Sequence, residues 1–318
     1  MKILLYLPKN FISEKFYFSG KVIIIFSAMV QRLKTFFLLS LLTFFLLFMG
    51  NLVGGKVGLT IALVMAGLMN FIAYFFSDKI VLAMYGAREL SPEEAPAVHR
   101  IIEELSASAG IPKPKVYLVP SPSPNAFATG RSPSHSAVAV TEGILRVLNE
   151  RELRGVLAHE LSHILNRDTL VQVVAATIAG AIMYLADMLR WGLFFFGGSR
   201  DNERDSGIGG IIGLIALAVL APIAAFLVQM AISRSREYLA DESGAKLCGD
   251  PLSLASALKK IAGLSQKVPL DANPATSHLF IVNPLSGSSI LSLFSTHPPI
   301  EKRIERLYKM AGIPLDLA

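Results

Sequence analysis

Four long apolar runs constrain this chain more than any other feature of its sequence. They cover residues 35–53, 57–76, 169–189 and 208–232. A helix needs about 20 apolar residues to cross the hydrocarbon layer of a bilayer, and each run has roughly that length. The chain is also 53% hydrophobic and only 17% charged, which is too apolar for an ordinary soluble domain. We therefore predict an integral membrane protein with about four transmembrane helices.

The first two runs predict a transmembrane hairpin over residues 35–76 that turns at Gly54, Gly55 and Lys56. Lys and Arg cluster just before and just after the hairpin, and only Lys56 lies between the two runs. Positively charged residues that flank membrane spans stay on the cytoplasmic side. We therefore expect a multi-pass protein of the cell membrane whose soluble parts face the cytoplasm.

The other two runs predict a second transmembrane pair over residues 169–232. Gln172, Asp187 and Pro222 interrupt these runs. Polar residues and prolines inside a span are tolerated where they line a cavity or contact other helices. The sequence therefore leaves open whether both helices of this pair cross the bilayer.

Residues 1–34 contain no apolar run of spanning length, and we interpret them as an N-terminal extension, with Met29 as a candidate native start. The net charge is +6, but the basic residues form no stripe with interleaved aromatics, so we expect no nucleic-acid partner. The single cysteine, Cys248, excludes an intramolecular disulfide and a Cys-rich zinc cluster.

Two segments, 88–168 and 233–318, have the composition of a soluble domain, and we expect them to form one catalytic domain in two parts. The first part predicts a helix from Ser91 to Gly110 and strands over 115–119 and 136–141, followed by further helices. The second part predicts helices with a loop between them. The expected fold is α+β, predominantly helical, with a small sheet.

A predicted helix that begins after Asn149 carries the motif His159-Glu160-Leu161-Ser162-His163. Residues four apart share a helical face, so both imidazoles can bind one metal ion with Glu160 beside them. Two His ligands leave room on zinc for a third protein ligand and a water. Glu160 could take a proton from that water and pass it to a leaving amine, which is peptide-bond hydrolysis. The motif alone does not separate a zinc site from a surface helix that carries two His by chance.

The segment after the fourth run contains Glu237 and Asp241, which are four residues apart and share a helical face. One interpretation is a solvated acidic pair beside two arginines, and spacing alone favours it. The other makes Glu237 a third zinc ligand and Asp241 a carboxylate that orients a ligand His.

Residues 123–130 contain a proline, an asparagine and a glycine, and we predict a loop there rather than a substrate-facing edge near the metal. Three histidines, His99, His135 and His278, have no partner visible in the sequence. We interpret them as structural or surface residues.

Four motifs, in order along the chain, resemble the HtpX group of membrane-bound zinc metalloproteases, which are relatives of the type 1 CAAX prenyl protease. The resemblance covers roughly Phe36 to the C-terminus. The motifs are Asn125–Gly130, His159–His163 with Asn166 and Asp168 behind it, Arg236–Asp241, and Ser295–Pro299.

The resemblance implies a zincin-like (gluzincin) domain that binds one zinc ion per chain. It implies that His159, His163 and Glu237 are the zinc ligands and that Glu160 is the general base and acid. It also implies that Asp241 supports the site.

Two further residues acquire a role only through the resemblance. Asn125 is expected on an edge strand of the active site, where it would contact the substrate. His297 could donate to the oxyanion of a tetrahedral intermediate, or it could be a turn residue before two prolines.

The implied function is the hydrolysis of misfolded or damaged membrane proteins in stress-linked quality control, with polypeptides and the lipid bilayer as partners. A narrower CAAX-type processing enzyme is an alternative, although four spans argue against it. A non-enzymatic scaffold is another, although all four catalytic positions are intact. The sequence does not indicate the oligomeric state.

Overall fold

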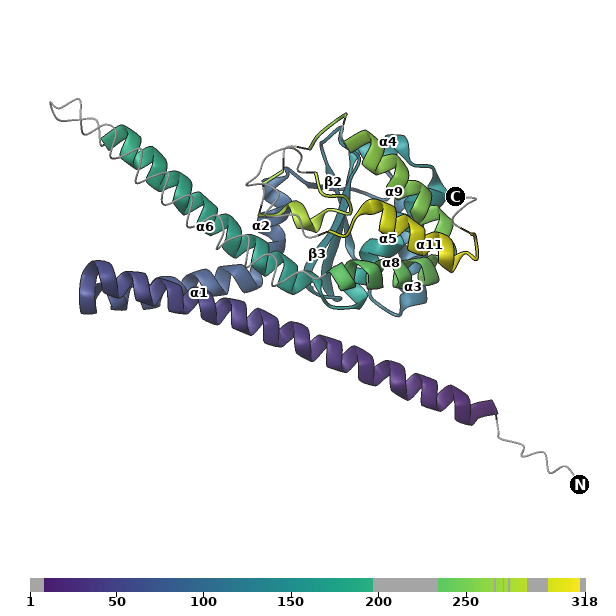
Figure 1. Cartoon of the computed structure of the whole chain (residues 1–318), viewed down its shortest axis with the longest axis horizontal. Coiled ribbons are helices and arrows are strands. Elements are labelled where there is room, and N and C mark those ends of the chain that lie inside the picture. The colour runs from purple at the N-terminus through teal and green to yellow at the C-terminus, as the bar shows by residue number, and fades with distance from the viewer. Residues whose placement is uncertain are drawn as a thin grey trace, which may run out of the picture.

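The computed structural model describes residues 9–196, 234–265, 267–270, 272–273, 275–284 and 297–314. The elements α1 (Lys9–Phe75) and α6 (Thr169–Phe196) extend beyond a globular part that contains the other elements (Figure 1). The fourth predicted span and Ser295 of the last motif lie outside the described residues.

The element α1 is a helical hairpin. Its backbone leaves the helical conformation at Gly54 and Gly55, where Gly55 has a φ of 51°, and the chain turns back on itself (Figure 1). The amide nitrogen of Asn70 donates to the hydroxyl of Thr43 on the opposite arm at 2.7 Å. The chain thus folds back at the glycine pair that the sequence suggested, because glycine tolerates a positive φ.

One helical segment in the described ranges, Gly54–Phe75, is long and apolar enough to cross a membrane, and a shorter apolar helix covers Thr169–Gly180. Many large apolar side chains of α1 are exposed, such as Phe36 at 69% and Phe44 at 68%. The first half of α6 instead packs against α1, with Val174 and other residues buried. The predicted number of four spans therefore stays a prediction.

A small mixed sheet lies in the globular part. Its order is β1-β2-β4-β3, with β2 and β4 parallel and the other pairs antiparallel. The strands are β1 (Arg88–Glu89), β2 (Lys115–Val119), β3 (Ala126–Ser132) and β4 (His135–Thr141). The mainly helical fold with a small sheet is confirmed.

The loop predicted for residues 123–130 is wrong from Ala126 onward, where the chain forms the edge strand β3. The first five residues of β3 are all buried. A strand covered on both faces shows no apolar and polar alternation, so the period of two that identifies strands is missing here.

The remaining helices surround the sheet. They are α2 (Ser77–Met84), α3 (Pro96–Ala109), α4 (Glu142–Val147), α5 (Glu150–Leu165), α8 (Arg234–Cys248), α9 (Pro251–Ser265), α11 (Ile300–Met310) and the single turn η1 (Ser277–Leu279). The helix predicted from Ser91 begins at Pro96, because Ser91 and Glu94 exchange their capping hydrogen bonds in a turn that precedes it.

The central helix of the globular part is α5. Asn149 and Glu152 form the capping box at its start, as the sequence predicted. Almost every residue from Glu152 to Ile164 is buried, including both histidines of the motif. The motif therefore lies in the interior of the domain, which excludes the surface-helix interpretation.

Two glycines let neighbouring helices approach α5 closely. An ideal Cβ on Gly244 of α8 would lie 2.8 Å from the backbone nitrogen of His159. A Cβ on Gly155 of α5 would lie 2.7 Å from the backbone nitrogen of Leu254 in α9. Because interiors are close-packed, neither position has room for a side chain without a backbone shift.

We expect Gly244→Ala to destabilise the protein by about 1–3 kcal/mol, because the added methyl group pushes α8 away from α5. Gly263→Ala on α9 is the matched control, since a Cβ there meets nothing within 4 Å. It should be neutral or stabilise by up to about 1 kcal/mol. Denaturant unfolding of the detergent-purified proteins measures both, and equal midpoints would contradict the close approach of α8.

Candidate metal centre and active site

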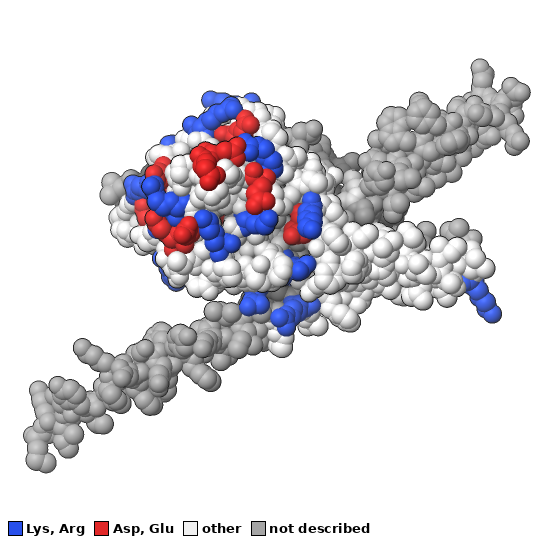
Figure 2. Space-filling view, turned by 180° about the vertical axis from the view of Figure 1, so that it is seen from behind, with Lys and Arg blue, Asp and Glu red and all other residues white. Residues whose placement is uncertain are grey.

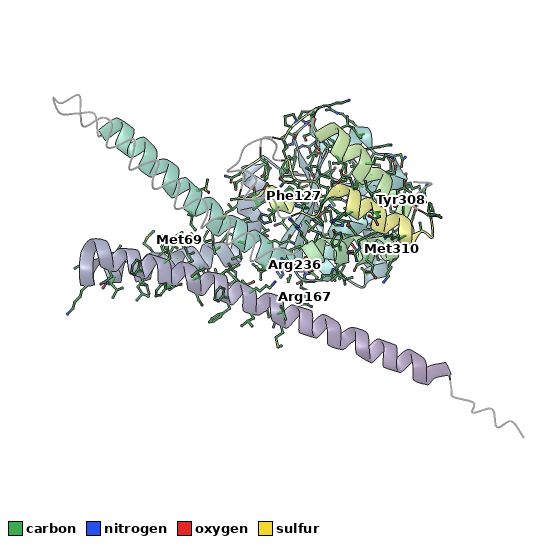
Figure 3. The ribbon with its side chains drawn as sticks, viewed as in Figure 1. Met69, Phe127, Arg167, Arg236, Tyr308 and Met310 are labelled. Carbon is green, nitrogen blue, oxygen red and sulfur yellow. The ribbon has the colours of Figure 1, made fainter. Side chains whose placement is uncertain are left out.

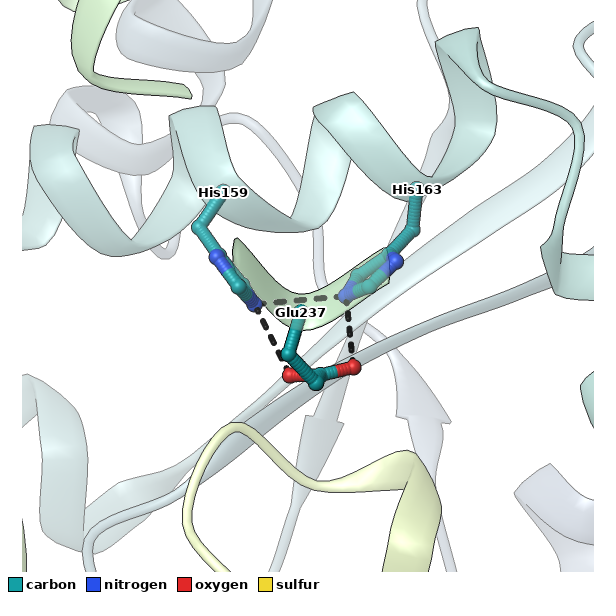
Figure 4. Close-up of side chains that lie close together, drawn as sticks. All are labelled: His159, His163 and Glu237. Atoms are coloured by element: carbon teal, nitrogen blue, oxygen red, sulfur yellow. Dashed lines mark hydrogen bonds and ion pairs between the residues drawn. The ribbon is translucent and has the colours of Figure 1, made fainter. Parts of the chain in front are cut away.

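His159 and His163 point their Nε2 atoms at a common position, with the two atoms 3.2 Å apart (Figure 4). Glu237 of α8 faces the same position, with Oε1 3.7 Å from Nε2 of His163 and Oε2 3.9 Å from Nε2 of His159. All three side chains are buried. The structure thus brings together the three residues that the resemblance implies as metal ligands.

The spacing of these donor atoms suits a tetrahedral ion. Two ligands at about 2.1 Å from a tetrahedral zinc ion lie about 3.4 Å apart. The three separations in the structure, 3.2, 3.7 and 3.9 Å, bracket that value. Two imidazoles and a carboxylate are also a donor set that zinc accepts.

Each histidine has a carboxylate on its other ring nitrogen. Oδ1 of Asp241 lies 3.0 Å from Nδ1 of His159, and Oδ2 of Asp168 lies 3.1 Å from Nδ1 of His163. A carboxylate at Nδ1 places the ring proton there and leaves the lone pair of Nε2 for a metal ion. Asp241 lies where the resemblance implies, whereas sequence reasoning gave Asp168 no role of its own.

Arg303 of α11 is a second residue that sequence reasoning missed. Its guanidinium is fully buried and binds both carboxylate oxygens of Asp241, at 2.8 Å from Nε and 2.7 Å from Nη2. Its Nη1 donates to the carbonyl of Ile281 at 2.7 Å. The sequence pattern that could have indicated a buried Arg303 is its position on the apolar face of the terminal helix, between Ile300 and Leu307.

The buried charges of the site shift one another's pKa values. Burial raises the pKa of Glu160, and neither of its oxygens has a hydrogen-bond partner among the described residues. Burial would also raise the pKa of Glu237, but His297 and the other nearby cationic groups outweigh it and lower the pKa to about 2. Burial would lower the pKa of His163, yet Asp168 and Glu237 raise it to about 10. The carboxylates therefore favour a positive charge between them, either a proton or a metal ion.

His297 lies at the site, with its side chain 6% exposed and Nε2 3.7 Å from Oε2 of Glu237. Asn125 lies directly before the edge strand β3, but it is buried and its side-chain nitrogen donates to the carbonyl of Val282 at 2.9 Å. The backbone nitrogen of Ile281 also donates to the carbonyl of Ala126. Ile281 and Val282 of the chain itself thus lie against the start of the edge strand, where a substrate was expected to bind.

The other three histidines have contacts that fit structural or surface roles. Nε2 of His99 lies 2.8 Å from the carbonyl of Leu90, and Nε2 of His278 lies 3.3 Å from the carbonyl of Gln172. His135 is exposed at the start of β4.

A buried helix with two histidines one turn apart, a glutamate between them in the motif and a second glutamate from a neighbouring helix is the arrangement of metal-dependent peptidases. The family model described as peptidase family M48 matches residues 92–311. The chain therefore belongs to peptidase family M48, and it is a metalloprotease, which confirms the predicted enzyme class.

Two relatives are named protease HtpX homolog. The one from Aquifex aeolicus (strain VF5) is 59% identical over 267 residues, which cover 84% of this chain and 88% of the relative. The one from Syntrophobacter fumaroxidans is 57% identical over 283 residues, which cover 89% and 100%. The resemblance to the HtpX group is therefore confirmed. Among solved structures, S. mikatae Ste24p aligns with 90% of this chain and 67% of its own, with 17% identity and a TM-score of 0.48.

We expect Arg303→Met to destabilise the protein by about 3–5 kcal/mol, because Asp241 would remain buried without its cationic partner. Arg306→Met, one turn along the same helix, is the control. Its guanidinium is exposed over the ring of Tyr238, and its loss should cost about 1 kcal/mol or less. Urea unfolding with a chelator present keeps metal binding out of the comparison.

The double variant Arg303→Met with Asp241→Asn should be more stable than Arg303→Met alone, because it removes the uncompensated charge. Equal stability of the single and double variants would show that the Arg303 to Asp241 pair does not determine the stability of this region.

Proposed function

We propose that this metalloprotease is a membrane-embedded zinc endopeptidase that uses one zinc ion per chain. The observation that carries the proposal is the convergence of His159, His163 and Glu237, with separations that suit tetrahedral zinc. The carboxylates of Asp241 and Asp168 behind the two imidazoles support it further, because such partners orient histidine ligands.

A bound zinc ion supplies Lewis acidity, which polarises the scissile carbonyl and makes a water acidic near neutral pH. Glu160 accepts the proton of the attacking water and returns it to the leaving amine. Its carboxylate has no other partner among the described residues, and its raised pKa suits a group that takes up and releases a proton. His297 lies beside Glu237, where its imidazole can donate to the developing oxyanion.

The edge strand β3 supports an extended polypeptide as the substrate. A peptide can add to the edge of a sheet through backbone hydrogen bonds and bring its scissile bond to a neighbouring site. At the start of β3 it would have to replace the hydrogen bond that Ile281 makes to Ala126. The strand contacts α5, the helix that carries both histidines. Asn125, directly before β3, would contact such a substrate if the segment at Val282 were displaced.

Membrane proteins are the proposed substrates, since the exposed apolar residues of α1 suit a lipid environment and adjoin the catalytic domain. Misfolded or damaged membrane proteins, cleaved in stress-linked quality control, are the class that the likeness to the HtpX group suggests. The proposal includes a multi-pass protein of the cell membrane with its catalytic domain in the cytoplasm.

We expect Glu160→Gln to bind one zinc ion and to lose casein cleavage and self-cleavage by a factor of about 100 or more. The amide keeps the size of the side chain but cannot accept the proton. Purification under chelation, addition of zinc, metal analysis and a cleavage assay test both points. Comparable cleavage by the variant and the wild type would contradict the role of Glu160, and absence of bound zinc in both would contradict the metal site.

The orientation can be tested with single cysteines in a Cys248→Ser background. We expect Lys56→Cys, at the hairpin turn, to react with a membrane-impermeant thiol reagent in intact cells, and Lys259→Cys, on α9, to react only after lysis. This expected orientation follows from the basic residues that flank the hairpin, because such residues stay on the cytoplasmic side. Labelling of Lys259→Cys alone in intact cells would place the catalytic domain on the opposite side.

A further inference from the structure

A cavity of about 580 Å³ lies between the hairpin α1 and the catalytic domain, away from the metal centre. Arg32 and Tyr74 of α1 line one side of it. Arg131 and His135 of the β3 and β4 hairpin line another, and Arg167 closes it from the connection between α5 and α6. Figure 3 shows Arg167 at the edge of the globular part that faces α1.

The cavity is basic. Three guanidinium groups line it, from Arg32, Arg131 and Arg167, and no Asp or Glu is among the lining residues. The guanidinium of Arg131 lies over the ring of Phe75, 5.4 Å from its centroid, and none of the three groups forms an ion pair with a described residue. Figure 2 shows basic side chains where the globular part meets α1. Cations that line one cavity without a neighbouring carboxylate raise the local concentration of anions.

The end of α5 explains how Arg167 reaches the cavity. Among the described residues, Arg167 is the one non-glycine residue with a positive φ, 59°. This left-handed conformation favours glycine or asparagine, and an asparagine stands one position earlier. The backbone nitrogen of Asp168 donates to the carbonyl of His163, so this left-handed turn ends α5 and leaves Arg167 at the mouth of the cavity.

The position of the cavity identifies the class of anion. Arg32 lies just before the first apolar run, and Tyr74 lies near the end of the second, where aromatic residues mark the level of lipid headgroups. Phe36, Leu39 and Leu170 give the cavity an apolar wall. A polar floor beside an apolar wall suits a phosphodiester that carries acyl chains better than a free anion.

We propose that this cavity binds the headgroup of an anionic phospholipid, with Arg32, Arg131 and Arg167 around its phosphate. Arginine forms paired, charge-assisted hydrogen bonds with phosphate oxygens, and basic pockets beside membrane helices on the cytoplasmic side bind anionic lipids. The inference rests on the proposed placement of the hairpin in the membrane. Arg167 directly precedes Asp168, which holds His163, so a bound headgroup anchors the end of the catalytic helix.

Native mass spectrometry of the full-length protein, released from detergent, tests the site with three probes: dioleoylphosphatidylglycerol, dioleoylphosphatidylcholine and inorganic phosphate. The wild type should bind one phosphatidylglycerol in preference to phosphatidylcholine. The triple variant R32Q/R131Q/R167Q should lose affinity for phosphatidylglycerol by about tenfold or more. The control K56Q/K79Q/K259Q removes the same number of positive charges outside the cavity and should keep the wild-type affinity for phosphatidylglycerol.

Equal weakening in both triple variants would overturn the inference, because it would reflect net charge alone. Binding of inorganic phosphate as tight as that of phosphatidylglycerol would overturn the lipid assignment. If the triple variant fails to fold, the single variant R32Q, on the exposed side of α1, gives the same comparison against K79Q.

Flotation with phosphatidylcholine vesicles separates this inference from the proposal on which it rests. Failure of the wild type to float would contradict the membrane placement itself. If the wild type floats but shows no preference for phosphatidylglycerol in native mass spectrometry, only the headgroup site is contradicted.

Discussion

The approach of α8 to α5 determines the geometry of the candidate active site. Gly244 lies against the backbone of His159, and only a residue without a side chain allows the two helices to come so close. This contact places Glu237 opposite the Nε2 atoms of both histidines and Asp241 behind one of them. The candidate metal ligands therefore come from two helices that are separated in sequence by the whole of α6 and the segment after it.

Several charged side chains are buried around the contact between α5 and α8. Buried ions are costly unless each is paired, so the members of the cluster depend on one another. Asp241 is shared between His159 and Arg303, and Asp168 is engaged by His163. Glu160 stands apart, because no described residue hydrogen-bonds its oxygens. A buried polar group left without a partner usually has a functional reason, and the proposed proton transfer would be such a reason.

The sequence predicted the parts of this arrangement that depend on local pattern. The capping box and apolar periodicity identified α5, and the spacing of the two histidines predicted their convergence. Glu237 was different, since spacing alone favoured a solvated pair and only the order of motifs pointed to the metal. Arg303 had no assigned role, because its partner Asp241 lies 62 residues away and is set by a tertiary contact. Asp168 lies only five residues after its partner His163, but the contact depends on the turn that ends α5. Residue patterns missed the edge strand β3, because burial on both faces removes its alternation, and only the resemblance indicated a strand there.

The most direct test of the account is an anomalous difference map, recorded at the zinc absorption edge, from crystals of the full-length protein grown with zinc. The account predicts one strong peak within about 2.0–2.2 Å of Nε2 of His159, Nε2 of His163 and a carboxylate oxygen of Glu237. A peak at another group of residues, or no peak between these three side chains, would contradict the central claim that they form the catalytic metal centre.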